Sequence, residues 1–206
     1  EIFADIDSPI ALAFVQRYLP PNGYRGVLFI ENLTSYEQAT RSDWPAFEGL
    51  ALVYAAGFKG SAQRLRTPDG CSLLYAARGG MGQSLREGFE AWLFGKGSAA
   101  AFFWGDLDWA GMRILSAMRA SFPGLTAWEP GFGPMLASLR EGGGHSPDAA
   151  DKQGQKAIEM TGCAYADGQL LPALRTAGRF VDQEAVSLQV AKDGEPGAAS
   201  SWPPTS

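Results

Sequence analysis

The sequence predicts an α/β fold whose mainly parallel, four-stranded sheet carries helices on both faces. Four short apolar runs have the length and low charge of buried strands, namely residues 25–30, 51–54, 99–104 and 125–128. Segments with apolar residues at helical spacing separate most of these runs. Strands that alternate with helices in this way typically form a parallel sheet between two helical layers.

The composition agrees with one folded domain and its appendages. The chain has 206 residues, of which 46% are hydrophobic and 19% charged, which is enough to bury a full core. We expect a helical lead-in over residues 1–24, the α/β domain over 25–192 and a disordered tail over 193–206. No apolar stretch approaches the length that crosses a bilayer and no signal peptide is visible, so we expect a cytoplasmic protein without membrane contact.

Local signals indicate the elements in the first part of the chain. Ser8 and Pro9 resemble the N-cap and first residue of a helix, which we expect to end before the turn at residues 20–23. The first strand leads into a second helix, in which Thr34 and Glu37 are spaced as a capping box.

The later part of the chain continues the alternation. Leu85, Phe89 and Trp92 fall on one face of a helix expected over residues 84–94. Another helix follows the third strand, and the fourth strand is expected to leave the sheet through residues 129–131. A Gly-rich loop is expected over residues 141–152. Three short helices are expected after it, over residues 155–160, 170–175 and 182–190.

Asp106 and Asp108 are the most informative residues, because they follow the third strand directly. Residues i and i+2 of an extended chain point to the same side, so the two carboxylates converge. Open α/β folds bind ligands at this carboxyl edge of the sheet. Two like charges so close are unfavourable unless a cation or a shared proton relieves them, and Mg²⁺ or Mn²⁺ suits such ligands.

Glu31 stands in a matching context, at the end of the first strand. Together, Glu31, Asp106 and Asp108 predict a metal site whose side chains converge within bridging distance. If repulsion between the acids dominates, Asp108→Ala leaves the metal-free protein at least as stable as before. If Asp108 only caps the following helix, the same change costs about 1 kcal/mol.

Other residue types narrow the chemistry. The only histidine, His145, lies in a Gly-rich loop, which disfavours a zinc site or a histidine-dependent triad. Cys71 and Cys163 are far apart and lack metal-ligand spacing, so we expect free thiols. A net charge of −5 argues against a general nucleic-acid binder, although active-site acids contribute to it and a partner could hold most of the DNA.

Four motifs, in order, resemble one family. They are FIENLTSYE at 29–37, YAAGF at 54–58, WGDLDWAGMRIL at 104–115 and VDQEA at 181–185. Glu31 followed by the aspartate pair is similar to the TOPRIM fold of topoisomerases, primases and several nucleases. The four motifs together resemble the carboxyl-terminal domain of JetD, the nuclease subunit of Wadjet anti-plasmid systems, over residues 3–186.

This resemblance implies a TOPRIM-like, Mg²⁺- or Mn²⁺-dependent DNA endonuclease domain in a bacterial plasmid-defence complex. Its implied partners are double-stranded DNA and an SMC-like complex, and the intact protein is expected to be a homodimer because a duplex break needs two strand cuts. The resemblance also implies a metal-site role for Glu184, whereas Asp182 is expected to cap the helix that begins there. Family members carry a separate amino-terminal DNA-binding region, and a start at Glu1 rather than Met is compatible with a fragment of a longer protein.

Hydrolysis of a phosphodiester needs an activated water and stabilisation of charge in the transition state and on the leaving oxygen. One or two divalent ions held by Glu31, Asp106 and Asp108 supply these, or Glu31 acts instead as a general base. Two alternatives stay open. One is a topoisomerase VI A-like module, with Mg²⁺ on the same acids and a catalytic tyrosine on a separate domain. The other is a non-catalytic assembly module with a structural metal ion.

Overall fold

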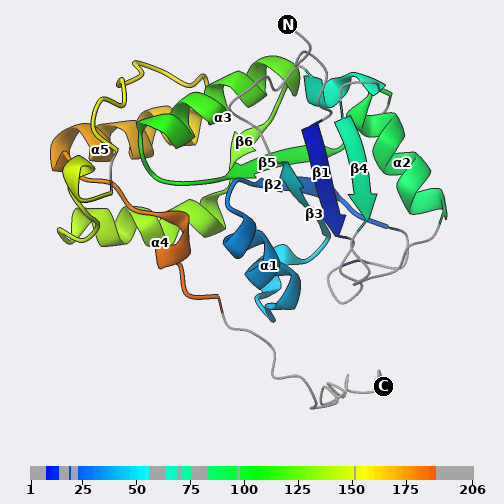
Figure 1. The fold of residues 1–206 in the computed structure, drawn as a ribbon, viewed down its shortest axis with the longest axis horizontal. Helices are drawn as coiled ribbons and strands as arrows, with labels where there is room; N and C mark the ends of the chain where they lie inside the picture. Colours follow the sequence, from blue (N-terminus) through cyan, green and yellow to red (C-terminus); the bar gives the residue numbers. More distant parts are fainter. Residues whose placement is uncertain are drawn as a thin grey trace, which may run out of the picture.

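The structure is a computed structural model that describes residues 8–13, 19, 23–55, 64–68, 71–75, 83–96, 98–150 and 152–188. Its strands are β1 (Ser8–Ala13), β2 (Gly26–Ile30), β3 (Leu50–Ala55), β4 (Cys71–Tyr75), β5 (Ala100–Trp104) and β6 (Thr126–Ala127). Its α-helices are α1 (Leu33–Arg41), α2 (Gln83–Leu93), α3 (Trp109–Ser121), α4 (Glu129–Arg140) and α5 (Leu171–Ala177). Figure 1 shows the strands joined in one sheet with helices around it. Within this described part, no helix combines the length and the apolar character needed to cross a membrane.

The four strands that the sequence predicts lie side by side in the order β3-β2-β5-β6, and all of them are parallel. Leu28 in β2 pairs with Leu52 in β3 and with Phe102 in β5. Every residue of β2 is buried, as expected for a strand that is covered on both faces. The predicted α/β class and its four-stranded parallel sheet are therefore confirmed, in agreement with a TOPRIM-like fold.

Two strands that the sequence analysis did not predict extend this sheet. β1 is antiparallel to β3 and parallel to β4. The helix predicted to begin at Ser8 is thus wrong for residues 8–13, while the rest of that segment up to Tyr18 lies outside the described residues. Pro9 is compatible with β1 because pairing with β3 begins only at Ile10, so no N–H of residue 9 is needed on that side.

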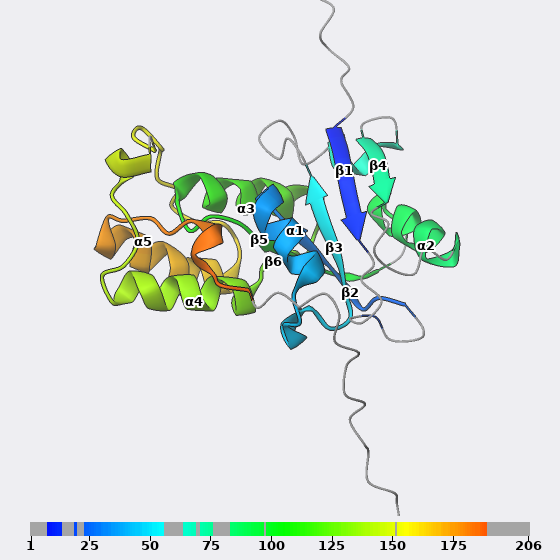
Figure 2. The ribbon, with the colours of Figure 1, turned by 60° about the horizontal axis from the view of Figure 1, so that its bottom comes forward.

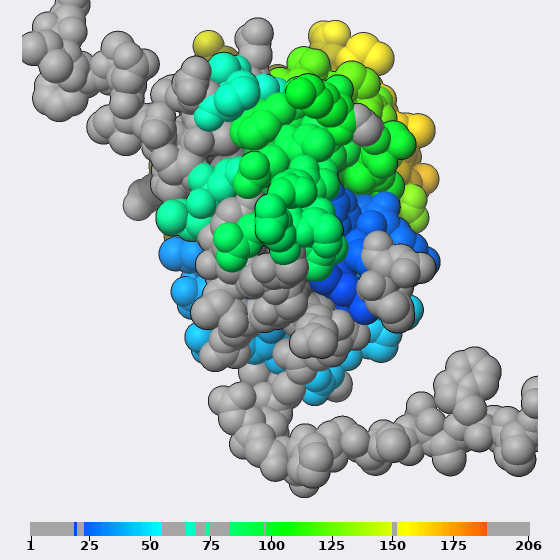
Figure 3. Space-filling model, turned by 90° about the vertical axis from the view of Figure 1, so that its right-hand side faces the viewer, coloured from blue at the N-terminus to red at the C-terminus, as the bar shows by residue number. Residues whose placement is uncertain are grey.

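Helices cover both faces of the sheet, as predicted. On one face, the ring of Phe29 lies 6.1 Å from that of Trp92 in α2 and 5.0 Å from that of Phe122 at the end of α3. On the other face, Tyr36 of α1 lies 6.0 Å from Tyr54 of β3. Figure 2 shows α1 in front of the sheet, and Figure 3 shows the side of the molecule on which α2 lies.

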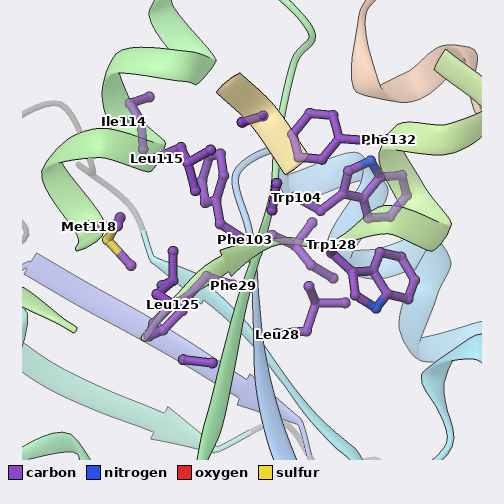
Figure 4. Packing of buried hydrophobic residues seen from close by; sticks show 14 of the residues in the cluster. Leu28, Phe29, Phe103, Trp104, Ile114, Leu115, Met118, Leu125, Trp128 and Phe132 are labelled. Carbon is purple, nitrogen blue, oxygen red and sulfur yellow. The ribbon is translucent and has the colours of Figure 1, made fainter. Parts of the chain in front are cut away.

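Aromatic side chains hold the ends of the central strands in place. The rings of Trp104, at the end of β5, and Trp128, just after β6, are 5.4 Å apart. Trp128 in turn stacks on Phe47 at 5.1 Å. Figure 4 shows Trp104 and Trp128 with Leu28 in this close packing. The carboxyl end of β5 is therefore fixed by the core directly behind the candidate site.

α4 replaces the simple exit expected at residues 129–131. Its first turn holds Pro130, a residue that early helical positions tolerate because their N–H groups have no helical partner. Gly131 is required because a Cβ there would lie 2.7 Å from the indole ring of Trp104. Glycine and proline at the start thus concealed a helix that buries Phe132 and Leu136 against the core.

α1 begins one residue after Asn32, whose side chain accepts a hydrogen bond from the backbone N–H of Ser35 at 3.1 Å. The capping box predicted at Thr34 and Glu37 is wrong, because both residues already lie inside the helix.

The last predicted helices are only partly present. Residues 155–160 are irregular rather than helical, since the Arg175 guanidinium binds the backbone carbonyls of Ile158 and Glu159. The helix expected at 170–175 is confirmed as α5, preceded by a π-helical turn (Ala166–Leu170). Of the helix expected at 182–190, the described residues contain only a 3₁₀ turn (Gln183–Ala185), while residues 189–190 and the tail at 193–206 lie outside the described residues.

Candidate active site

The carboxyl ends of β2 and β5 bring Glu31 and Asp106 to the same edge of the sheet. Ile30 pairs with Trp104 in parallel register, and the Glu31 N–H continues the ladder by donating to the Trp104 carbonyl at 3.0 Å. The Asp106 backbone N–H donates to Glu31 Oε2 at 3.4 Å. The expected placement of Glu31 beside the aspartate pair is therefore what the structure has.

Two glycines around the aspartates allow this close packing. A Cβ at Gly105 would collide with Glu31 Oε2 and would lie 2.7 Å from the ring of Phe103. A Cβ at Gly111 would collide with the backbone carbonyl oxygen of Asp106. The glycines of the motif therefore provide space for the acids, and neither has a positive φ angle.

Asp106 is oriented by a segment distant in the sequence. Its Oδ1 accepts a hydrogen bond from the Gln183 backbone N–H at 2.8 Å. One residue further on, Leu107 and Val181 exchange backbone hydrogen bonds of 2.9 and 3.2 Å. Residues 181–183 thus lie against the aspartate pair and fix Oδ1 of Asp106. The other carboxylate oxygen, Oδ2, takes no part in this contact.

Asp108 is the N-cap of α3 and is almost fully buried, with 1% of its surface exposed. Its Oδ1 accepts a hydrogen bond from the Gly111 N–H at 2.7 Å. Its Oδ2 accepts one from Gln155 Nε2 at 3.0 Å. The two roles that the sequence analysis set against each other, helix cap and site acid, therefore fall on different oxygens of one carboxylate.

Lys152 occupies the point where the carboxylates converge. Its Nζ lies 2.8 Å from Asp106 Oδ2, 2.8 Å from Asp108 Oδ2 and 2.7 Å from Asp182 Oδ1. Sequence reasoning missed this residue, because it lies 46 positions after Asp106, at the end of a segment read as a loop. The cation that relieves the crowding of the aspartates is thus, in this structure, an ammonium group of the chain itself.

Burial and hydrogen bonds change the pKa values of the charged groups in this cluster in different directions. Burial acts to lower the pKa of Lys152, but hydrogen bonds to the three aspartates outweigh it and hold that pKa above its ordinary value. Burial raises the pKa of Asp106, and its bonds from Lys152 and the Gln183 N–H offset this only in part. Burial also acts to raise the pKa of the more exposed Asp182, yet bonds from Lys152 and His145 lower it overall.

Glu31 differs from the aspartates because it forms no ion pair within the described part of the chain. Burial raises its pKa to about 7, and the charges of Asp106 and Asp108 add to this effect. A carboxyl group with that pKa can hold or release a proton near neutrality, as a general base requires.

The VDQEA motif contributes more than the expected Glu184. The Glu184 carboxylate accepts a hydrogen bond from Asn32 Nδ2 at 3.1 Å, and is not among the groups that contact Lys152. Asp182, considered above as a helix cap, makes no side-chain capping bond and instead binds Lys152 and His145. The buried Gln183 accepts from the Asn32 N–H at 3.1 Å, while its Nε2 has no partner among the described residues.

The described residues contain no ready-made group of three His, Cys, Asp or Glu side chains arranged around a metal position. However, one position is already surrounded by carboxylate oxygens from Asp106, Asp108 and Asp182, with Lys152 Nζ as its cation. Oxygen donors of this kind are those that Mg²⁺ and Mn²⁺ prefer. The donor set therefore fits a hard divalent ion, on the condition that Lys152 moves away.

A groove of about 570 Å³ opens beside Asp108, along α3. Arg113 of α3 and Lys156 line it, and so does Gln155, the residue that binds Asp108. The groove thus joins two basic side chains to the acidic cluster through a shared neighbour.

The comparison with known proteins agrees with the sequence motifs. The family model described as "Wadjet protein JetD, C-terminal" matches residues 21–192, most of the chain and all of the candidate site. No curated protein matches the chain. The chain belongs to the family of Wadjet JetD carboxyl-terminal domains.

Proposed function

We propose that this chain is a metal-dependent DNA endonuclease domain of a bacterial Wadjet plasmid-defence complex. Membership of the JetD carboxyl-terminal family supports the defence context. The observation that carries the nuclease proposal is the single cation position bounded by oxygens of Asp106, Asp108 and Asp182, with Glu31 beside it.

A divalent ion at this edge would be held by Asp106 and Asp108, with Asp182 or Glu31 completing the set. When bound, such an ion polarises a phosphate oxygen and lowers the pKa of a water molecule. The chain's own residues supply orientation: the Gln183 N–H fixes Asp106, and the Gly111 N–H fixes Asp108. Glu31, whose pKa is raised to about 7, can accept the proton of the attacking water.

DNA is proposed to approach along the groove of α3. Arg113 and Lys156 line it and can pair with phosphates next to the acidic cluster. The overall charge of −5 limits the affinity of this chain alone, so a DNA-binding region elsewhere in the intact protein and an SMC-like partner are proposed to hold most of the duplex. A homodimer is proposed because both strands must be cut.

Incubation of the purified chain with supercoiled plasmid and Mn²⁺ tests this function. We expect nicked and linear DNA with free ends in Mn²⁺, no cleavage in EDTA, and no cleavage by Asp106→Asn. DNA ends covalently attached to protein would instead favour a topoisomerase VI A-like module. Plasmid left intact, also when the JetD partner subunits are added, would favour a non-catalytic assembly module.

A further inference from the structure

We propose that Lys152 is an internal cation of the metal-free site, and that Lys152 and a divalent metal ion exclude each other. The inference rests on the proposed metal-dependent function and adds to it the event that must accompany loading. The Lys152 ammonium holds three carboxylates at 2.7 to 2.8 Å in the structure. The same carboxylates are the proposed metal ligands, so loading requires the lysine to leave.

Asp106 and Asp108 each have one carboxylate oxygen bound by a backbone N–H, which leaves the other oxygen for a cation. Asp106 Oδ1 is committed to the Gln183 N–H, and Asp108 Oδ1 to the Gly111 N–H. The remaining oxygen of each aspartate is the one that contacts Lys152 Nζ. A metal ion at about 2.1 Å from those oxygens would therefore lie within a few ångströms of the ammonium, where two positive charges repel strongly.

The carboxylates around Lys152 carry more negative charge than one ammonium group balances. One ammonium faces the carboxylates of Asp106, Asp108 and Asp182, with Glu31 close behind them. With only one positive charge among these carboxylates, the cluster keeps a net negative charge. It therefore still attracts a divalent ion while Lys152 is in place. Lys152 lowers metal affinity without abolishing it.

Hydrogen bonds on either side of Lys152 hold its segment in place. Its backbone N–H donates to the Pro147 carbonyl at 2.9 Å. On its other side, Gln155 contacts Asp108 and the Ala110 N–H, and the next contacts are those of Arg175 with the backbone of residues 158 and 159. The stretch 152–155 is thus held on the site by two side chains and borders the open groove of α3, so it can move aside without unfolding a helix or strand.

Titration of the metal-free chain with Mn²⁺ in a calorimeter tests the exclusion directly. Lys152→Gln should bind Mn²⁺ at least tenfold more tightly than the unsubstituted chain. Lys96→Gln is the matched control, because it removes the same charge from an exposed position after α2, outside the groove of α3, and its affinity should stay within twofold. Lys152→Arg retains the positive charge, so this variant should bind Mn²⁺ no more tightly than the unsubstituted chain.

A second measurement needs no substitution, and decides the question if Lys152→Gln does not fold. Amines of the unsubstituted chain are acetylated briefly with acetic anhydride, and the labelling of each lysine is quantified by mass spectrometry. Lys152 is only 17% exposed and its Nζ contacts three carboxylates, so it should react slowly without metal and several times faster with saturating Mn²⁺. Lys96, an exposed lysine outside this segment, should react at the same rate in both conditions.

The results separate the two proposals. Equal Mn²⁺ affinity of the unsubstituted chain and Lys152→Gln, with unchanged labelling of Lys152 in Mn²⁺, would overturn the exclusion and leave the metal site standing. Absence of Mn²⁺ binding to both proteins would overturn the metal site and the exclusion with it. Detectable binding by Lys152→Gln alone would support both, with Lys152 lowering the affinity of the unsubstituted chain below the range of the titration.

Discussion

Asp108 has a different partner on each oxygen of its carboxylate. These partners determine whether a substitution of Asp108 raises or lowers the stability of the protein. Oδ1 caps α3, and Oδ2 binds Lys152 and Gln155. Because Lys152 already relieves the repulsion between the two aspartates, removing one of them does not stabilise the metal-free protein. Repulsion between the two aspartates alone predicted unchanged or higher stability after Asp108→Ala. With Lys152 in place, we instead expect lower stability of the metal-free protein.

We predict that Asp108→Ala lowers the free energy of unfolding in EDTA, and that Asp108→Asn lowers it less. Asparagine keeps an oxygen for the Gly111 N–H, so the difference between the variants should be about 1 kcal/mol, the usual contribution of an N-cap. Urea denaturation of the three proteins gives these values. An alanine variant as stable as the unsubstituted chain would show that repulsion dominates after all.

Glu31 allows a prediction about pH, because its pKa in the folded chain is raised to about 7 from an ordinary 4.5. The folded state then binds the Glu31 proton more tightly than the unfolded state does. The stabilisation from this proton is fully present below pH 4.5 and is lost as the pH rises through 7.

Glu31→Gln should therefore equal the unsubstituted chain in stability near pH 4.5 and exceed it at pH 8, in EDTA. The expected gain at pH 8 is on the order of 2 kcal/mol, somewhat less than the full shift implies because the side chain is partly exposed. Urea denaturation at four pH values measures it, with Glu159→Gln as a control for the loss of one exposed negative charge. A gain that does not change with pH would assign the effect to something other than this proton.

Single residues of the site could be predicted only where local sequence determines their position. Glu31, Asp106 and Asp108 follow apolar strands directly, and this places them at one edge of a parallel sheet. Lys152 and Asp182 reach the same point from segments without a regular pattern, through contacts made only when the whole chain is folded. No local spacing encodes such contacts, which is why the cation of the site was missed.

Gly105 joins β5 to the aspartate pair, and its lack of a side chain is a requirement of packing rather than of backbone conformation. A Cβ would meet the Glu31 carboxylate and the Phe103 ring. We predict that Gly105→Ala destabilises the chain by about 1 to 3 kcal/mol and weakens Mn²⁺ binding, because Glu31 must move.

The matched control is Gly133→Ala, in α4. No described atom lies within 4 Å of a Cβ at that position, so alanine should raise stability by about 0.5 to 1 kcal/mol through its better helix propensity. Thermal melts compare the two variants, and a calorimetric titration gives their Mn²⁺ affinities. Equal effects of the two substitutions would mean that Gly105 has no special packing role.

The elements that the sequence missed have a common physical cause. The first turn of α4 contains Pro130 and Gly131, and Gly131 packs against Trp104. Both residue types are rare inside helices, so the sequence does not show a helical pattern there. β1 is a strand because β3 and β4 pair with its two edges, and these partners are more than 35 residues away in the sequence. By contrast, β2 and β5 were predicted because the full burial of β2 and the partial burial of β5 go with apolar runs that are visible locally.

The distribution of charge over the molecule gives a prediction about DNA. The groove of α3 carries Arg113 and Lys156 next to an acidic cluster, in a chain of net charge −5. Arg113→Gln with Lys156→Gln should weaken DNA binding and reduce the slope of log K against log salt by about 2, one for each lost phosphate contact. Fluorescence anisotropy with a labelled duplex measures the slope, and Arg41→Gln, an exposed arginine at the end of α1, should leave it unchanged.

If the proposed nuclease function holds, the number of active sites in the complex determines the product of cleavage. One chain has one cluster of Glu31, Asp106 and Asp108, so a duplex break needs two chains or two successive cuts by one. If the intact protein acts as a homodimer, a heterodimer with one Asp106→Asn subunit cuts a single strand.

We therefore predict that mixing the unsubstituted protein with a fivefold excess of Asp106→Asn, after subunit exchange, changes the product from linear to nicked plasmid. Agarose gels resolve these products, and light scattering reports the dimer. Linear product at an unchanged ratio, together with a monomeric mass at micromolar concentration, would mean that one chain cuts both strands in turn.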